Sequence, residues 1–197
     1  MRARRPRRDL RLDGRRYHER QRSGRGQFVE AALYDCGLSL LHPHAANHLL
    51  DGRAPKRSGN AHPNIAPYDT CATGSAPIFL AVGNDGQFAK LCEVLGVAGL
   101  ARDERFASNA ARTANRAALK LALEDRLGAH PCNEIAHHLV RSEVPCAPIQ
   151  SVPQAIAHPH TAQRDMVVRI GEDYAGVASL IKLSRTPATY RTAPPWS

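Results

Sequence analysis

Histidine is the first residue type in this sequence to consider as a source of chemistry. His42, His44 and His48 lie close together, and His137 and His138 are adjacent in a predicted helix. The sequence has no HExxH motif, and no cysteine–histidine pair has the spacing of a zinc finger. We therefore interpret these histidines as surface or capping residues and predict no metal site.

The segment 83–86, Gly-Asn-Asp-Gly, joins a predicted buried strand to a predicted helix. Such a junction can present backbone N–H groups to an anion or a carbonyl, although Asn-Asp-Gly also forms ordinary turns. The sequence contains no GxGxxG or Walker A phosphate loop. The junction is therefore a candidate binding loop with a simple turn as its alternative.

The five cysteines stand at irregular positions, 36, 71, 92, 132 and 146, without a CxxC pair. This pattern indicates reduced thiols and a cytoplasmic location, and gives no disulfide framework. Cys146 lies between two prolines and could act as a nucleophile, but no neighbouring residue supplies a base. We interpret Cys146 as structural.

Charge is distributed very unevenly along the 197 residues, whose formal net charge is +9. Residues 1–26 hold eleven arginines and three acids, whereas the rest of the chain is nearly neutral. An arginine-rich tail can neutralise phosphates, so a nucleic-acid-binding protein is one alternative. Tyr17 is the tail's one aromatic residue and the body is neutral, which disfavours that role. No apolar run is long enough for a membrane span, and no secretory signal is present.

Hydrophobic periodicity predicts the elements that would position these residues. It favours an α/β or α+β protein, with strands and helices that alternate loosely. A short strand at 27–33 is predicted to run into a first helix that reaches residue 50. Further helices are predicted at 84–96, at about 111–128, around 135–140, and from 151, where the helix is short. The predicted strands are 78–82, an edge strand at 144–149, and 167–170, with a linker at 51–67 and a surface course for the last 25 residues.

Seven strings, taken in order, resemble one family. They are SGRGQ with Val29 at 23–29, RSG with HP and APY at 57–68, AVGNDGQF at 81–88, DERF followed by Asn109, Arg112, Asn115 and Arg116, VPCAP at 144–148, HPH with Arg164 and Met166, and SRTP at 184–187. Each string is weak alone, but their shared order over residues 23–190 is similar to the class III CoA-transferases. This family includes formyl-CoA transferase, carnitine CoA-transferase and α-methylacyl-CoA racemase. One departure is Gly74-Ser75-Ala76, which alters a turn.

The resemblance implies a large domain with a doubly wound sheet that binds CoA, a smaller inserted domain, and two interlocked subunits. In the transferases of this family an aspartate attacks the acyl-CoA thioester, so that a mixed anhydride and an aspartyl-CoA thioester follow. In the racemases a His/Asp pair moves the α-proton. The family implies an acyl-CoA thioester and a carboxylic acid as substrates, with no covalently bound cofactor.

The resemblance begins at Ser23 and covers only the C-terminal half of a family member. Arg2 stands where the family has its nucleophilic aspartate, and Asp9 and Asp13 are not at that spacing. We therefore assign no catalytic nucleophile and no CoA-binding residue. Asp85 stands where the racemase branch has an auxiliary carboxylate, with a helix-capping role as its alternative.

These observations predict four segments and a function. Residues 1–22 are expected to be a basic, disordered tail unrelated to the family, such as a misassigned or frameshifted start; 23–67 a remnant of the large domain and a connector; 68–160 a small α/β domain; and 161–197 a C-terminal return segment. The predicted protein is a truncated CoA-transferase-like chain that forms a homodimer or joins a missing N-terminal half. The further alternative is an inactive fragment that self-associates through exposed apolar residues around Phe28, Leu33, Leu38 and Leu41.

Overall fold

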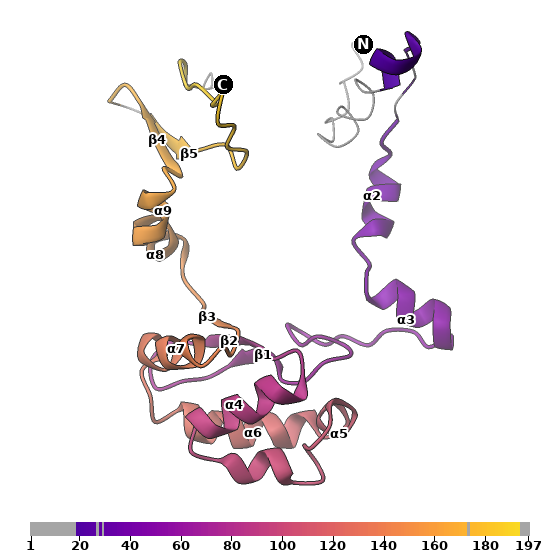
Figure 1. Cartoon of the computed structure of the whole chain (residues 1–197), viewed down its shortest axis with the longest axis vertical. Coiled ribbons are helices and arrows are strands. Elements are labelled where there is room, and N and C mark those ends of the chain that lie inside the picture. The colour runs from indigo at the N-terminus through magenta and orange to yellow at the C-terminus, as the bar shows by residue number, and fades with distance from the viewer. Residues whose placement is uncertain (1–18, 27, 29, 173, 194–197) are drawn as a thin grey trace. The chain divides into compact units, whose positions relative to one another are not determined.

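The computed structural model describes residues 19–26, 28, 30–172 and 174–193 (Figure 1). Most of the predicted basic tail, residues 1–18, therefore lies outside the described residues. Residues 19–23 are helical, although the composition predicts disorder as far as residue 22. Glu, Arg and Gln are good helix formers, and they make up residues 19–22. The chain divides into two units, Met1–Pro63 and Asn64–Ser197, which are described separately below.

The first unit contains two short helices, α2 (Leu33–Ser39) and α3 (His44–Asp51). The prediction of one helix reaching residue 50 is wrong, because residues 40–43 form a turn and Pro43 caps α3. A proline is tolerated at this position because the backbone N–H group that it lacks would have no partner within the helix. Phe28 and residues 30–32 are not in a strand, and neither helix has a buried residue. Helices this short are marginal without tertiary packing.

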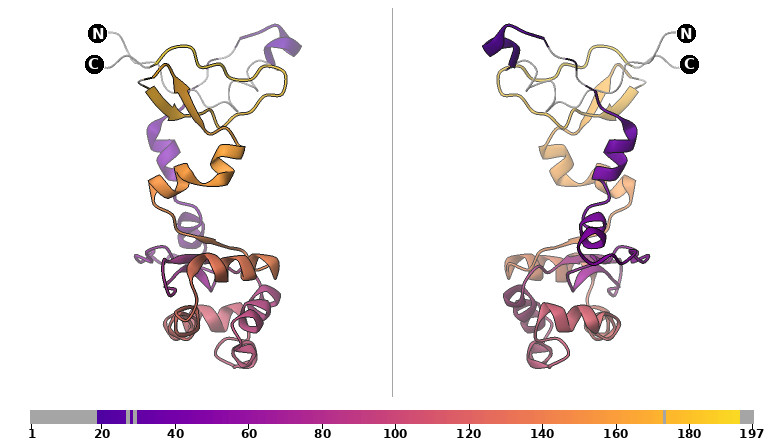
Figure 2. Two further views of the ribbon diagram at one scale, coloured as in Figure 1. Left: turned by 90° about the vertical axis from the view of Figure 1, so that its left-hand side faces the viewer. Right: turned by 90° about the vertical axis from the view of Figure 1, so that its right-hand side faces the viewer.

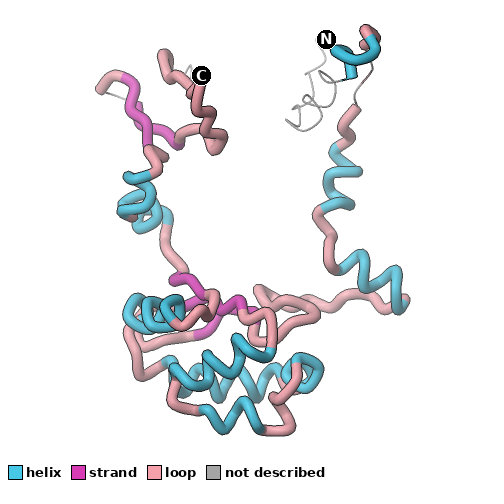
Figure 3. The backbone as a smooth tube through the Cα atoms, viewed as in Figure 1, coloured by secondary structure: helices cyan, strands magenta, loops and turns pink. Residues whose placement is uncertain are grey.

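The second unit begins with a three-stranded antiparallel sheet in the order β1 (Tyr68–Cys71), β2 (Ile78–Ala81), β3 (Cys146–Pro148). The strand expected at 78–82 and the edge strand expected at 144–149 are both confirmed. A proline at an edge is consistent with its missing N–H group. The strand β1 is not predicted by the sequence pattern, because its residues Tyr-Asp-Thr-Cys carry no apolar run. The linker expected before it is confirmed, since residues 52–67 contain no helix or strand (Figure 3).

Five helical segments follow the sheet strands β1 and β2, and Figure 2 shows α4 and α6 on one side of the sheet. They are α4 (Asp85–Val94), the 3-10 helix η1 (Ala98–Arg102), α5 (Asn109–Ala114), α6 (Arg116–Leu127) and α7 (Cys132–Arg141). The helix predicted over 111–128 is in fact two helices, because the backbone at Asn115 leaves the helical conformation. The predicted stop of α4 is confirmed at Gly96, where φ is +68°.

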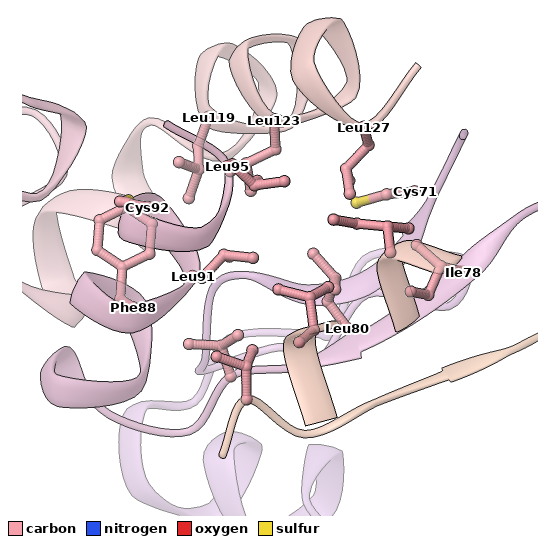
Figure 4. Close-up of a cluster of buried hydrophobic side chains, with 14 of the residues drawn as sticks. Cys71, Ile78, Leu80, Phe88, Leu91, Cys92, Leu95, Leu119, Leu123 and Leu127 are labelled. Carbon is pink, nitrogen blue, oxygen red and sulfur yellow. The ribbon is translucent and has the colours of Figure 1, made fainter. Parts of the chain in front are cut away.

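One hydrophobic core joins these elements (Figure 4). Eighteen of the nineteen buried apolar side chains among the described residues lie between positions 66 and 144. The strand β2 supplies Ile78 and Leu80, which share a face because side chains alternate along a strand. The predicted apolar stripe of α4 is confirmed, and α6 adds three leucines at helical spacing. The helix residues are Phe88, Leu91, Cys92, Leu95, Leu119, Leu123 and Leu127.

The chain then forms α8 (Val152–Ala157), α9 (Pro159–Gln163) and a hairpin of β4 (Val167–Ile170) and β5 (Tyr174–Val177). The capping box predicted at Ser151 and Gln154 is confirmed, and so is the strand β4. The strand β5 was not predicted, and it lies in the segment expected to run along the surface. The described residues therefore form a mixed α/β structure with small antiparallel sheets, and none of their helices is long and apolar enough to cross a membrane.

Exposed hydrophobic side chains gather on either side of the core in the sequence. Of the eighteen large ones that are exposed among the described residues, eight lie at 28–50 and eight at 149–190. The exposure predicted for Phe28, Leu33, Leu38 and Leu41 is confirmed, with exposed fractions of 88, 89, 49 and 49 %. We call residues 28–50 and 149–190 the apolar flanks. They contrast with residues 66–144, whose large apolar side chains are mostly buried.

Candidate functional site

The junction between β2 and α4 is a capped turn whose own side chains satisfy part of its backbone. Asn84 is the N-cap of α4, and its Oδ1 accepts a hydrogen bond from the Gln87 N–H at 2.9 Å. Gln87 Oε1 in turn accepts from the Gly83 N–H at 2.7 Å. The predicted capping interaction is thus present, with Gln87 reaching one residue further back than in a standard capping box. These two N–H groups are not available to an anion.

Asp85 occupies the first position of α4, where a carboxylate is stabilised by the helix dipole. Its Oδ1 accepts a hydrogen bond from Arg112 Nη2 at 2.6 Å. The two partners differ sharply in exposure, since the Asp85 side chain is 64 % exposed and that of Arg112 is fully buried. Asp85 is therefore neither a simple cap nor an unpaired carboxylate, because a buried cation holds one of its oxygens.

Arg112 is the one charged or polar residue fully enclosed among the described residues. Its Nε donates to the Ala66 carbonyl at 2.7 Å, and its Nη1 donates to the Phe106 carbonyl at 3.0 Å. The guanidinium also lies over the Phe88 ring, 4.5 Å from the ring centre. A buried charge is tolerated only when it is paired and hydrogen-bonded, and Arg112 meets both conditions. It connects α5, α4 and two loops.

Two neighbouring side chains hold the same stretch of backbone. Asn109 Nδ2 donates to the Asn64 carbonyl at 2.8 Å, and its Oδ1 accepts from the Ala66 N–H at 3.2 Å. Arg116 Nη1 donates to the Ile65 carbonyl at 3.1 Å. We call Asn109, Arg112 and Arg116 the connector clamp, because together they bind the backbone of residues 64–66. In the sequence these residues stand out only as part of a family string, which did not predict their role in the clamp.

The DERF string before the clamp forms a self-contained loop. Arg105 Nη2 donates to Asp103 Oδ2 at 2.6 Å, and Arg105 Nε donates to Asp103 Oδ1 at 3.0 Å. These hydrogen bonds hold the pKa of the Asp103 carboxyl below its usual value. Phe106 follows, with its ring in the core and 1 % of its surface exposed. The loop thus positions the Phe106 carbonyl to accept the hydrogen bond from Arg112 Nη1.

The departure at residues 74–76 has a structural role in a turn against the start of α7. The Gly74 N–H donates to the His130 carbonyl at 2.9 Å, and the Ser75 hydroxyl accepts from the Cys132 N–H at 2.9 Å. A Cβ atom on Gly74 would lie 2.8 Å from the Gly128 carbonyl oxygen. A glycine is therefore required here by close backbone packing.

The remaining candidates do not converge on a reactive centre in the described residues. No group of three His, Cys, Asp or Glu side chains there could hold a metal ion. His48 Nδ1 lies 3.0 Å from the Arg53 carbonyl, and His158 Nδ1 accepts from the His160 N–H. Burial raises the pKa of the Cys146 thiol to about 11. Since the thiolate is the nucleophile, this shift supports a structural Cys146.

Comparison with known proteins places this geometry in a wider context. The model of CoA-transferase family III matches residues 15–196, so the similarity extends upstream of Ser23. The chain is 36 % identical over 178 residues to the succinate–glutarate CoA-transferase of Agrobacterium fabrum, a match that covers 88 % of this chain and 44 % of that protein. It is also 36 % identical to the acetyl-CoA:oxalate CoA-transferase of Acetobacter aceti, with 78 % of this chain and 40 % of that protein covered.

Solved structures show the same relationship. A CAIB/BAIF family protein from Brucella suis superimposes with a TM-score of 0.72 and 40 % identity, over 91 % of this chain and 47 % of that one. A protein of Mycobacterium tuberculosis, at 21 % identity, shares the fold with a TM-score of 0.78 over 94 % of this chain and 49 % of that one. The chain thus spans less than half the length of these relatives.

Proposed function

Because the chain belongs to CoA-transferase family III, we propose that it is one component of an enzyme that moves CoA from an acyl-CoA thioester to a carboxylic acid. The family match over residues 15–196 carries this proposal. The relatives named above are transferases, which favours the transferase branch over the racemase branch. Acyl-CoA and the acid are both substrates, and the proposal includes no covalently bound cofactor. The matched relatives also disfavour a nucleic-acid-binding role for the basic tail.

The chemistry that the family implies proceeds by exchange between acyl groups. An aspartate carboxylate attacks the thioester carbonyl and releases the CoA thiolate, which leaves a mixed anhydride. The thiolate then attacks the aspartyl carbonyl of the anhydride, which releases the first acid and forms an aspartyl-CoA thioester. The acceptor acid then attacks the aspartyl-CoA thioester and releases the CoA thiolate, which leaves a second mixed anhydride. The thiolate attacks the acceptor's carbonyl in this anhydride, which forms the new acyl-CoA and restores the aspartate.

This chain offers a supporting carboxylate for such a reaction. We assign Asp85 an auxiliary role, because Arg112 fixes Oδ1 while most of the side chain remains exposed. Oδ2 can then accept a hydrogen bond from a substrate. We assign the nucleophile to a partner segment outside these 197 residues, since Arg2 stands at the position that the family resemblance gives to the aspartate.

The apolar flanks support the need for such a partner. They expose sixteen of the eighteen large exposed hydrophobic side chains among the described residues, an arrangement typical of a surface that another chain covers. In this proposal residues 68–160 form the small domain, and residues 23–67 and 161–197 complete a large domain together with the partner. The complete enzyme would be cytoplasmic and dimeric, as the family resemblance and the free thiols suggest.

Co-expression tests this proposal. The chain is produced with the part of the Agrobacterium relative that lies outside the matched region, as a separate tagged polypeptide. The purified pair is incubated with succinyl-CoA and glutarate, and glutaryl-CoA is measured by liquid chromatography. We expect glutaryl-CoA from the pair and none from either polypeptide alone, with a slower rate for D85N.

Each negative result has a distinct meaning in this experiment. Failure of the two polypeptides to co-purify would contradict the docking role of the apolar flanks. Co-purification without glutaryl-CoA, and without turnover of any other acyl-CoA and acid pair, would favour the inactive fragment. The variant L121K controls for the effect of a lysine on an exposed leucine elsewhere, because Leu121 is exposed in α6, outside the apolar flanks. We expect L121K to leave co-purification unchanged.

A further inference from the structure

Ala66 is the residue at which the connector clamp meets the surroundings of Asp85. It is fully buried. Its N–H donates to Asn109 Oδ1 at 3.2 Å, and its carbonyl accepts from Arg112 Nε at 2.7 Å. A buried backbone group without a partner costs free energy. Both polar groups of Ala66 therefore depend on side chains of α5.

Arg112 links the position of Ala66 to that of Asp85. The same guanidinium that donates to the Ala66 carbonyl through Nε donates to Asp85 Oδ1 through Nη2, at 2.6 Å. A guanidinium is planar and its donors point in fixed directions. The Phe106 carbonyl at Nη1 and the Phe88 ring against the guanidinium restrict it further. A shift of the Ala66 carbonyl must therefore move the donor that holds Asp85, or break one of these contacts.

Asn109 holds Ala66 without a hydrogen bond to Asp85. Its side chain is hydrogen-bonded to the Asn64 carbonyl and the Ala66 N–H and, in the described part of the chain, to no other residue. Asn109 is the first residue of α5, and Arg112 lies three positions later. Residues at this spacing are neighbours on a helix surface, so both side chains reach the same stretch of backbone.

We propose that Asn109 is a positioning residue for the Asp85 carboxylate. Asn109 fixes the Ala66 peptide, whose carbonyl in turn fixes the Arg112 guanidinium. The guanidinium then holds Asp85 Oδ1, while most of the Asp85 side chain stays exposed to a substrate. The benefit to catalysis rests on the proposed function of Asp85, but the order of the Asp85 side chain can be measured without turnover.

NMR spectroscopy of the full chain gives the first test. The three-bond couplings from the Asp85 carboxyl carbon to its backbone nitrogen and carbonyl carbon report which χ1 rotamers are populated. We expect the couplings of a single rotamer in the unchanged chain and couplings averaged over several rotamers in N109A. K120M is the matched control, because Lys120 joins α6 to Asp69 Oδ2 at 3.1 Å but donates no hydrogen bond to residues 64–66 in the described part of the chain. We expect K120M to keep the single rotamer.

The variant N109D separates a loss of positioning from a loss of folding. An aspartate keeps an oxygen that can accept from the Ala66 N–H. A carboxylate at the start of α5 is also stabilised by the helix dipole. We therefore expect N109D to fold and to keep the single Asp85 rotamer.

The second measurement uses the co-expressed pair described above. We expect N109A to lower kcat about tenfold and to leave the KM for succinyl-CoA within about twofold, because only the alignment of Asp85 changes. An unchanged kcat in N109A would overturn the proposal, and so would an unchanged Asp85 rotamer in that variant. Averaged couplings in the unchanged chain, in K120M or in N109D would also overturn it. A pair without turnover would count against the proposed function, whereas averaging in N109A alone would still support the positioning role.

Discussion

Replacing Arg112 by methionine tests the idea that the connector clamp holds the fold of residues 64–148 together. Methionine fills most of the volume but donates no hydrogen bond, so the buried carbonyls of Ala66 and Phe106 lose their donors. Each buried carbonyl without a donor costs about 1–3 kcal/mol. The lost cation–π contact with Phe88 costs up to about 2 kcal/mol. Because these contributions overlap, we expect R112M to lower the free energy of unfolding by about 4 kcal/mol.

The loss can be measured by urea denaturation of the full chain, followed by circular dichroism at low protein concentration. D85N is the matched control, since it removes the charge of the partner but keeps an oxygen that can accept from Arg112. Because the Asp85 side chain is mostly exposed, water can also accept the hydrogen bond from Arg112, and we expect D85N to lower the free energy of unfolding by about 1 kcal/mol. The clamp does not act as described if the free energy of unfolding of R112M lies within about 1 kcal/mol of that of the unchanged chain, or if D85N lowers it as much as R112M does.

Three further predictions concern packing, thiols and the apolar flanks. G74A should lower the free energy of unfolding by about 1–3 kcal/mol in urea denaturation, because its Cβ would press on two backbone carbonyl oxygens. A thiol reagent should label exposed Cys36 far faster than buried Cys71 at pH 8. Burial raises the pKa of Cys71 from 9.0 to about 12, so this thiol loses its proton at a lower pH in the unfolded chain than in the folded one, and the free energy of unfolding should fall as the pH rises from 9 towards 12. The double variant L49K/L50K should self-associate less than the unchanged chain in light scattering, and identical mass distributions would contradict the role of the apolar flanks.

The local elements of this protein were predictable because their signals lie within a few residues. The spacing of Phe88, Leu91, Cys92 and Leu95 gave the buried face of α4, and all four side chains are buried. The capping box of α8 and the strand β4 followed from equally short patterns. Family membership could also be predicted, since it depended on the order of several strings rather than on any contact.

The errors have a different origin. The strand β1 has no apolar run, and it exists because its backbone pairs with β2. The helices predicted as single segments are broken near Pro43 and at Asn115, where the backbone geometry of a turn prevails over the hydrophobic period. Val140 fits the apolar pattern of α7 and yet is 56 % exposed, because the core lies against the other face of that helix.

The family, the main helices and the division between a basic tail and a neutral body can therefore be read from local patterns in the sequence. The roles of the polar residues in the candidate site follow from the tertiary structure alone. Arg112 reads in the sequence as one arginine among many, but it is buried and donates to the Ala66 carbonyl 46 residues away. A hydrogen bond across that separation leaves no periodic trace in the sequence, because its donor and acceptor meet only after the connector and α5 have packed on the same core.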